Sequence, residues 1–388
     1  MKVLCVFGTR PEAIKFAPLI RLLRQDKFFQ TIVCTTSQHV EMLNQVLSTF
    51  NIQRDFDLKV MRHNQTLTYS TGEILSDFYN VLQEVKPDWV LVQGDATSAF
   101  AAGVASYYFK ASIGHVESGL RTWDKYAPFP EEFNRRAIAL IADANFAPTE
   151  TARKNLIREN VAPSRIWVTG NTGIDALNLI LRKFDENSAL TAEMQRRFQF
   201  LSPRKKLVLV TAHRRESFGE KFEQICNALR DIANNGDNVQ LVYPIHLNPN
   251  ALETVHKTFG RVDLSKGWAS PLDNLFLTEP VDYQSMVYLL RTAYVVLTDS
   301  GGLQEEAPTL GKPVLVVRDV TERPEGVIAG VAKIVGRSSQ SIADSTIELL
   351  HDSDKYAKMA RPLNLYGDGH AAEKIIDALK SLSNPKPS

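Results

Sequence analysis

The sequence predicts an α/β protein of two Rossmann-like domains, whose parallel sheets face each other across a cleft. Short apolar runs alternate with amphipathic segments of helical length along the whole chain. The runs are continuous rather than alternating, which is typical of parallel strands buried on both faces, and strand–helix alternation implies right-handed βαβ units. The succession occurs twice in 388 residues, and a single core rarely grows beyond ~250–300 residues.

Each half of the chain contains its own series of expected strands. The first series is 2–7, 31–36, 89–93, 112–116, 144–147 and 165–169, with helical patterns at 11–24, 40–50 and 68–84. The second series is 207–212, 240–243, 275–278, 294–298, 313–317 and 332–335, with helical patterns at 218–234 and 341–351. The first strand of each series runs into a short loop that carries arginine.

The domain boundary is expected near the Gly-Asn-Thr-Gly stretch at 170–173. This gives an N-terminal domain over 1–170 and a C-terminal, nucleotide-binding domain over 171–370. A charged stretch at 182–206, with a helix at 190–198, precedes the second sheet. A last amphipathic helix at 371–382 can pack back on the N-terminal domain.

The composition limits the class of partner. Forty-five basic and 44 acidic residues give a net charge of +1, whereas nucleic-acid binders usually have a clear basic excess. The three cysteines, Cys5, Cys34 and Cys226, form no CxxC pair and are expected to be buried free thiols of a reducing compartment. No apolar run reaches the ~18 residues of a membrane span. We therefore expect a cytoplasmic protein that binds neither nucleic acid nor membrane.

The first candidate site follows the first strand. Gly8 permits a tight turn, and Pro11 suits the first position of a helix. Arg10 and Lys15 can both point at an anion held over that helix N-terminus. A plain helix start with solvated charges explains the same residues equally well.

The second candidate site is a strand–turn–helix segment around Ser300, Gly301 and Gly302. The two glycines let the backbone approach a ligand, and the unpaired N–H groups of the helix start suit a diphosphate. Glu306, just over a turn into the helix, is placed to accept hydrogen bonds from two ribose hydroxyls. The alternative is that Ser300 only caps the helix.

The third candidate is His213 with Arg214 and Arg215, directly after the first strand of the second series. Ligands of open α/β sheets lie at the carboxyl ends of strands, where these cations can neutralise a leaving pyrophosphate. A solvated ion-pair cluster is the alternative.

The fourth candidate is a set of acids. Asp95 and Glu117 each come just after an expected strand, and Glu131 follows Pro130 at an expected helix start. Each acid alone is more often structural. Three acids at ligand-facing positions of one sheet suggest general acid–base chemistry.

Other motifs are missing from the sequence. It contains no Walker GxxxxGK[ST], no GxGxxG and no HExxH, and the histidines are too sparse for a catalytic metal site. We expect no cofactor and no metal.

Together these segments resemble one family, the non-hydrolysing UDP-N-acetylglucosamine 2-epimerases, which have the two-Rossmann GT-B architecture. The resemblance runs from residue 3 to about residue 369. It is carried by FGTRPEAIK (7–15), QGDATS (93–98), GHVESGLRT (114–122), PEEFNRR (130–136), PTETARKNLIREN (148–160), TAHRRESFG (211–219), YPIHLNPN (243–250), TDSGGLQEEAPTLGKPVLVVRDVTERPEG (298–326) and YGDGHA (366–371).

The resemblance implies residue roles. Asp95, Glu117 and Glu131 correspond to the catalytic carboxylates, His213 to the group that stabilises departing UDP, and Lys15 to a group near the reacting sugar. The implied contacts with UDP are Arg10, His213, Ser300, Gly301, Gly302, Glu306 and Arg323. The wider set implied to bind the substrate adds Lys15, Asp95 and Glu117, and also Val281 and Met286, at positions where some relatives carry Gln and an aromatic residue.

The resemblance also implies the reaction, which is reversible interconversion of UDP-GlcNAc and UDP-ManNAc. UDP is eliminated in anti fashion to give 2-acetamidoglucal, and is then re-added. The family implies a homodimer, supply of ManNAc for surface polysaccharide such as capsule, and allosteric activation by a second UDP-GlcNAc. The matching activator positions are Gln38, Glu41, Glu131, Arg214 and His246. The alternatives are a GT-B glycosyltransferase with a UDP-sugar donor and a hydrolysing epimerase.

Overall fold

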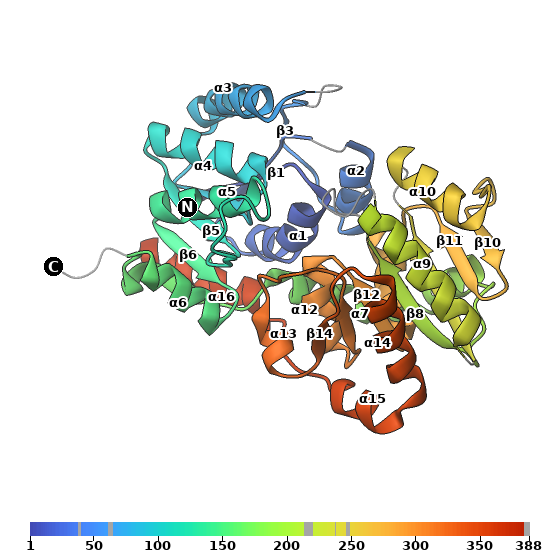
Figure 1. Cartoon of the computed structure of the whole chain (residues 1–388). Coiled ribbons are helices and arrows are strands. Elements are labelled where there is room, and N and C mark those ends of the chain that lie inside the picture. Colours follow the sequence, from blue (N-terminus) through green and yellow to red (C-terminus); the bar gives the residue numbers. More distant parts are fainter. Residues whose placement is uncertain (38–39, 61–64, 213–219, 237, 246–248, 384–388) are drawn as a thin grey trace. The chain divides into compact units, whose positions relative to one another are not determined.

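The computed structural model describes residues 1–37, 40–60, 65–212, 220–236, 238–245 and 249–383 (Figure 1). The chain divides into two compact units. The N-terminal unit holds residues Met1–Leu179 and the stretch from Tyr366 onward, and the C-terminal unit holds Ile180–Leu365. Each unit contains one seven-stranded sheet.

The sheet of the N-terminal unit is parallel throughout, in the order β3-β2-β1-β4-β5-β6-β7. Its strands are β1 (Lys2–Phe7), β2 (Gln30–Thr35), β3 (Phe56–Asp57), β4 (Trp89–Gln93), β5 (Ser112–Val116), β6 (Ala144–Ala147) and β7 (Ile166–Val168). Its helices are α1 (Arg10–Gln25), α2 (Val40–Thr49), α3 (Leu67–Val85), α4 (Thr97–Phe109), α5 (Glu131–Ile141), α6 (Glu150–Arg158), the first part of α7 (Thr172–Glu186), and α16 (Ala371–Ser383). A 3-10 turn, Pro163–Arg165, precedes β7.

The sheet of the C-terminal unit has the order β10-β11-β9-β8-β12-β13-β14. Its strands are β8 (Lys206–Thr211), β9 (Val239–Pro244), β10 (Trp268–Leu272), β11 (Leu275–Thr278), β12 (Val295–Thr298), β13 (Val314–Val316) and β14 (Ala332–Ile334). Its helices are α8 (Ser188–Arg197), α9 (Glu220–Asn235), α10 (Pro249–Phe259), α11 (Tyr283–Thr292), α12 (Gly301–Thr309), α13 (Pro324–Ile328), α14 (Ser339–His351) and α15 (Ser353–Met359).

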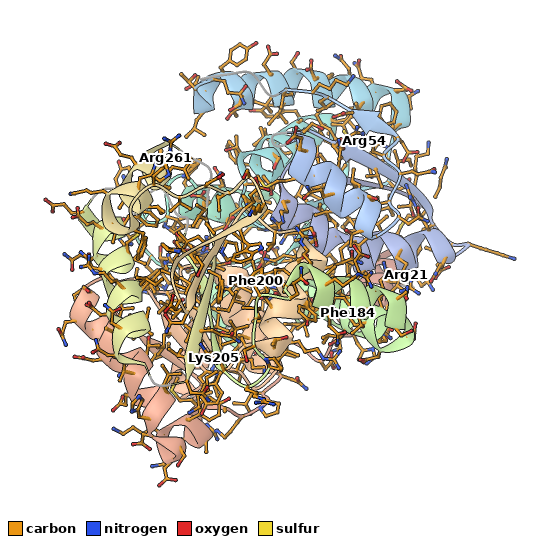
Figure 2. All side chains as sticks on the ribbon, turned by 90° about the vertical axis from the view of Figure 1, so that its right-hand side faces the viewer. Arg21, Arg54, Phe184, Phe200, Lys205 and Arg261 are labelled. Atoms are coloured by element: carbon orange, nitrogen blue, oxygen red, sulfur yellow. The ribbon has the colours of Figure 1, made fainter. Side chains whose placement is uncertain are left out.

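The prediction of two α/β units is confirmed, but the second sheet is not purely parallel. β10 pairs antiparallel with β11, because only Asp273 and Asn274 separate the two strands and a parallel crossover needs a dozen or more residues. Aromatic rings pack along this edge. Phe200, labelled in Figure 2, lies with its ring centroid 4.6 Å from that of Trp268 and 4.9 Å from that of Phe276.

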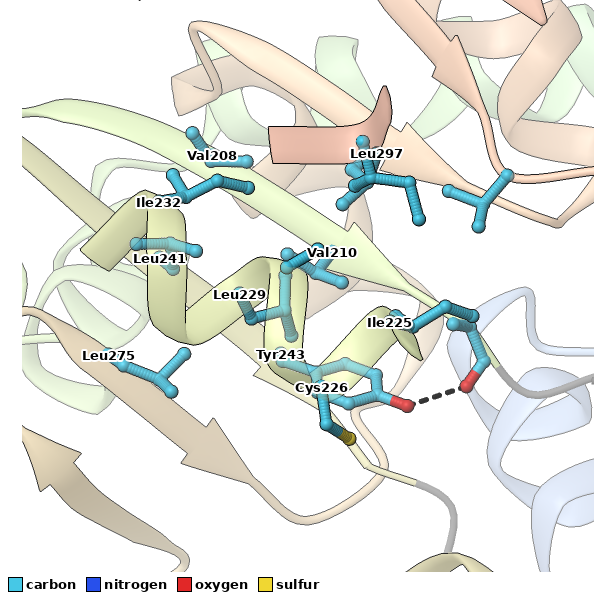
Figure 3. Close-up of a cluster of buried hydrophobic side chains, with 14 of the residues drawn as sticks. Val208, Val210, Ile225, Cys226, Leu229, Ile232, Leu241, Tyr243, Leu275 and Leu297 are labelled. Atoms are coloured by element: carbon cyan, nitrogen blue, oxygen red, sulfur yellow. Dashed lines mark hydrogen bonds between the residues drawn. The ribbon is translucent and has the colours of Figure 1, made fainter. Parts of the chain in front are cut away.

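Buried strand residues form much of the core. In the C-terminal unit, residues of β8, β9 and β12 pack against α9, as Figure 3 shows. Tyr243 is fully buried there, and its hydroxyl donates a 2.6 Å hydrogen bond to the carbonyl oxygen of Ala212 (Figure 3). That bond fixes the backbone just where β8 ends.

The boundary between the units differs from the expected position near Gly170. The chain passes from one unit to the other inside α7, so that the first part of this helix belongs to the N-terminal unit. Asp175 explains the difference, because its carboxylate accepts hydrogen bonds from the N–H groups of Ala371 (3.2 Å) and Ala372 (2.9 Å) and so ties α7 to the start of α16. Helix α16, red in Figure 1, packs against α1.

Cys5, Cys34 and Cys226 are free and buried. Among the described residues, no helix is long and apolar enough to cross a membrane. Within the same ranges, no group of three or more His, Cys, Asp or Glu side chains is arranged to hold a metal ion.

Candidate active site

The carboxyl ends of three neighbouring strands, β1, β4 and β5, gather predicted site residues at one edge of the N-terminal sheet. Arg10 follows β1, Asp95 follows β4 and Glu117 follows β5. Ligands of open parallel sheets bind at this edge.

A capping box holds the start of α1. The N–H groups of Gly8 and Thr9 donate to the Glu12 carboxylate at 3.0 and 2.8 Å, and Ser98 on α4 donates to the same carboxylate at 2.7 Å. Gly8 admits no side chain, since a Cβ there would lie 1.9 Å from Thr36 Oγ1. Glu12, which the sequence did not single out, therefore fixes the loop that carries Arg10.

Glu117 is the most enclosed of the three predicted acids, with a side chain only 5% exposed. Lys15 Nζ and Asn171 Nδ2 both donate to its Oε1, the latter at 2.8 Å, and Gln93 Nε2 donates to its Oε2. Its backbone has φ of +62°, a left-handed conformation that is uncommon outside glycine and often found at functional sites. Lys15 thus forms an ion pair with the acid.

Asp95 is more exposed, at 32% of its side chain, and is bound by α5. Arg135 pairs with its carboxylate at 2.5 Å, and Asn134 Nδ2 donates to its backbone carbonyl at 2.9 Å. Glu131 lies one turn before Arg135 on the same helix and is partly exposed. Contacts from α5 therefore connect the segments of Asp95 and Glu131.

The neighbouring glutamate has a structural role instead. Glu132 is fully buried, and its carboxylate accepts from the N–H groups of Thr122 and Trp123, both at 3.1 Å, and pairs with Arg135 at 3.4 Å. Of the two consecutive acids, Glu131 is therefore the more exposed.

His115 lies on β5 directly before this site and is completely buried. Its Nε2 lies 2.7 Å from the carbonyl oxygen of Gly94, so the ring donates there and supports the turn that precedes Asp95. Burial lowers the pKa of His115 from 6.5 to about 4, so the folded protein holds a neutral imidazole.

This burial predicts a pH dependence of stability. Between pH 6.5 and pH 4 the unfolded chain binds a proton at His115 that the folded protein excludes, so the stabilisation is fully present above pH 6.5 and is lost as the pH falls toward 4. The loss amounts to about 3 kcal/mol at pH 4. Urea unfolding at pH 7 and pH 4 should show this loss in wild type and not in His115→Gln, whereas the exposed His351→Gln should follow wild type. An equal loss of unfolding free energy between pH 7 and pH 4 in all three proteins would contradict the role of His115.

In the C-terminal unit, β12 leads into the predicted phosphate turn. Ser300 is the N-cap of α12, and its side chain makes no capping hydrogen bond. Its backbone N–H donates to Thr298 Oγ1 at 2.9 Å, and Thr298 is hydrogen-bonded to Thr211 at 2.6 Å. The turn is thereby fixed to the ends of β8 and β12.

Arg323 lies beside this turn in a network of buried charges. Its Nε donates to Glu305 at 2.6 Å and its Nη1 to Glu322 at 2.5 Å, while Arg318 donates to the other oxygen of Glu322 at 2.8 Å. A Cβ on Gly301 would lie 2.5 Å from the Arg323 guanidinium carbon. The two glutamates, which the sequence did not single out, hold the cation against the helix start.

Glu306 is 7% exposed and accepts a 3.1 Å hydrogen bond from the hydroxyl of Tyr283. Tyr283 begins α11, which also carries the half-buried Met286, and Val281 is buried just before that helix. Tyr283, which no sequence pattern indicated, therefore links Glu306 to the segment that carries Val281 and Met286.

Four predicted residues, Gln38, His213, Arg214 and His246, lie outside the described residues. Of the other activator positions, Glu41 is exposed in the first turn of α2 and Glu131 begins α5.

One Rossmann-like unit has a glycine turn at a helix start, and the other has acids at its strand ends. This arrangement is typical of GT-B-type nucleotide-sugar enzymes, and the chain is of this class. The family described as UDP-N-acetylglucosamine 2-epimerase matches residues 21–380. The UDP-N-acetylglucosamine 2-epimerase of Escherichia coli (strain K12) is 50% identical over 381 residues, which are 98% of this chain and 99% of that protein.

Solved structures agree. The UDP-GlcNAc 2-epimerase from Neisseria meningitidis bound to UDP-GlcNAc has a TM-score of 0.93 at 44% identity, covering 98% of this chain and all of that one. The Methanocaldococcus jannaschii enzyme in complex with UDP-GlcNAc and UDP has a TM-score of 0.83 at 29% identity, with coverage of 98% and 100%. The chain belongs to the UDP-N-acetylglucosamine 2-epimerase family. The predicted family, the GT-B-type fold and the assignment as an epimerase are confirmed.

Proposed function

We propose that the chain interconverts UDP-GlcNAc and UDP-ManNAc by inverting the sugar at C2. The observation that carries the proposal is the buried Glu117 carboxylate, which forms an ion pair with Lys15. It lies at the same edge of the N-terminal sheet as Asp95. The family membership and the relatives solved with UDP-GlcNAc or UDP support the choice of substrate.

The chemistry requires UDP to leave first. The C2 proton is not acidic, so a base alone cannot remove it. When the bond between C1 and the UDP oxygen breaks, cation character at C1 acidifies C2, the C2 proton passes to a base, and the C1–C2 double bond of 2-acetamidoglucal forms. In the return step the UDP oxygen bonds to C1 while a proton is added to the opposite face of C2.

The residues divide between these tasks. We assign the diphosphate to the Ser300–Gly301–Gly302 turn and Arg323, with Arg10 and His213 as further cations that stabilise UDP as it leaves. Preorganised donors of this kind act on the charge that develops on the leaving group. We assign the ribose hydroxyls to Glu306 and the uracil to the segment of Val281 and Met286.

Proton exchange on two faces of C2 needs more than one acid–base group. Asp95, Glu117 and Glu131 supply three, and a positioned acid or base contributes typically ~10²–10⁴-fold. The donors around Glu117 leave that carboxylate fixed in place, whereas Asp95 and Glu131 are nearer to solvent.

The test is incubation with UDP-GlcNAc alone, with the products separated by chromatography. An equilibrium mixture of UDP-GlcNAc and UDP-ManNAc is expected. Free ManNAc with UDP would indicate a hydrolysing epimerase, and unchanged UDP-GlcNAc that is consumed only with an acceptor would indicate a glycosyltransferase.

We further propose that a second UDP-GlcNAc activates the enzyme through Gln38, Glu41, Glu131, Arg214 and His246. Glu131 would then belong to both sites. We expect the initial rate to depend sigmoidally on the UDP-GlcNAc concentration. A hyperbolic dependence would contradict activation by a second UDP-GlcNAc.

We also propose a homodimer. Helices α4 and α5 pack together and expose large apolar side chains, among them Tyr107 (56%), Tyr108 (69%), Phe133 (53%) and Leu140 (66%), which is typical of an interaction surface. A monomeric mass in sedimentation would contradict this.

Finally, we propose that the enzyme works in the cytoplasm and supplies ManNAc units for surface polysaccharide such as capsule. Three buried free thiols are consistent with a reducing compartment. Normal ManNAc content in the polysaccharide of a strain without the enzyme would contradict the supply role.

A further inference from the structure

Asn171, which looked from sequence like part of an inter-domain turn, lies against Glu117. The residue is 1% exposed and stands directly before α7. Its Nδ2 donates to Glu117 Oε1 at 2.8 Å, while its Oδ1 accepts from the N–H of Gly173 at 3.0 Å. Because the oxygen is committed to that N–H, the amide nitrogen must face the carboxylate.

The returning C-terminal segment fixes the backbone of Asn171. Its N–H donates to the carbonyl oxygen of Tyr366 at 2.6 Å. Next to it, Gly170 and Gly367 lie so close that a Cβ on Gly170 would be 2.9 Å from the Cα of Gly367, and both glycines have positive φ, of +89° and +137°. Only glycine tolerates both the contact and the conformation, so this backbone contact leaves Asn171 little freedom.

The carboxylate of Glu117 receives donors on both oxygens. Lys15 and Asn171 share Oε1, and Gln93 contacts Oε2. Lys15 reaches the site on a long, flexible side chain from α1, whereas Asn171 has a short side chain on a fixed backbone. The orientation of Oε1 is therefore set by the amide rather than by the ammonium group.

We propose that Asn171 is a positioning residue that sets the Glu117 carboxylate for proton exchange at C2. The inference rests on the proposed function, and it assigns to Asn171 no contact with the substrate. An amide is needed because the residue must accept from Gly173 at one end and donate to Glu117 at the other, which neither a carboxylate nor an alkyl side chain can do.

The test is Asn171→Asp, which keeps the shape of the side chain and replaces the donor with a second carboxylate 2.8 Å from Glu117. We expect kcat to fall by about 100-fold with KM within about threefold, since misplacement of a reacting group costs on this order. The acidic limb of the pH–rate profile should move to higher pH, because two carboxylates in contact share a proton. Asn171→Ala, which removes the donor without adding charge, should lose kcat with a smaller shift of that limb.

The matched control is Asp175→Asn, the opposite isosteric exchange one turn further along α7. Asp175 is also buried and also holds the returning segment, through Ala371 and Ala372. We expect a lower Tm, kcat within about twofold of wild type and an unmoved pH–rate profile.

The possible outcomes separate the two claims. If both Asn171 variants turn over as wild type, or lose kcat only in parallel with Tm and with an unmoved pH–rate profile, the positioning role is wrong. If the wild-type protein itself does not convert UDP-GlcNAc, the proposed function fails, whatever the variants do.

Discussion

Glu117→Gln is expected to lower kcat by ~10²–10⁴-fold while the protein binds UDP with unchanged affinity. The glutamine keeps the shape of the side chain but cannot exchange a proton, and it removes the counter-charge of Lys15. UDP affinity should be kept because the proposed ribose contact and, apart from Arg10, the proposed diphosphate contacts lie in the C-terminal unit, to which Glu117 does not belong. Epimerisation rates and calorimetric titration with UDP measure the two quantities.

The control for this variant is Glu150→Gln on α6. The side chain of Glu150 is 64% exposed and pairs with Arg153 at 3.5 Å, so the same exchange should leave the rate within about twofold of wild type. A Glu117→Gln protein that binds UDP and turns over at the full rate would remove Glu117 from the mechanism.

Gly301→Ala is expected to weaken UDP binding by about 100-fold, or about 2.8 kcal/mol. The new Cβ would lie 2.5 Å from the guanidinium carbon of Arg323, and that cation cannot move without breaking its buried bonds to Glu305 and Glu322. The variant should also unfold at a lower temperature, because a buried charge that loses its partners is costly. Calorimetric titration and thermal unfolding check both effects.

Two further glycines make this test specific. A Cβ on Gly302 meets no protein atom nearer than Ser300 Oγ at 4.0 Å, so Gly302→Ala should fold normally, and a loss of UDP affinity there would show that the ligand approaches this backbone. Gly72→Ala on α3, with nothing within 4 Å, should keep UDP affinity and gain helix stability. If Gly301→Ala binds UDP with wild-type affinity, the assignment of the diphosphate to this turn is wrong.

Much of the fold could be predicted from the sequence because buried parallel strands are continuous apolar runs. The strands that were missed lack this signal: β3 has only two residues, and β10 carries Pro271 and is partly exposed. Helix α4 was missed for the opposite reason. It packs between α3 and α5 and is apolar on every side, so it has no amphipathic period to detect.

The site could be predicted only in part. Glu117, Asp95 and Ser300 follow strands, and position in a βα unit is a local signal that a sequence contains. Their partners are set by long-range packing. Asn171 meets Glu117 across 54 positions of the chain, and Tyr283 meets Glu306 across 23, so no local spacing indicates either contact.

The central claim, that C2 is inverted by loss of its proton from one face and addition of a proton to the other, is tested most directly by incubating the protein with UDP-GlcNAc alone in D₂O and examining C2 by NMR. The account predicts UDP-ManNAc and UDP-GlcNAc that both carry deuterium at C2, because the proton removed from one face exchanges with solvent before a proton is added to the other. UDP-ManNAc that keeps the original C2 hydrogen, or unlabelled UDP-GlcNAc with no manno product, would contradict it.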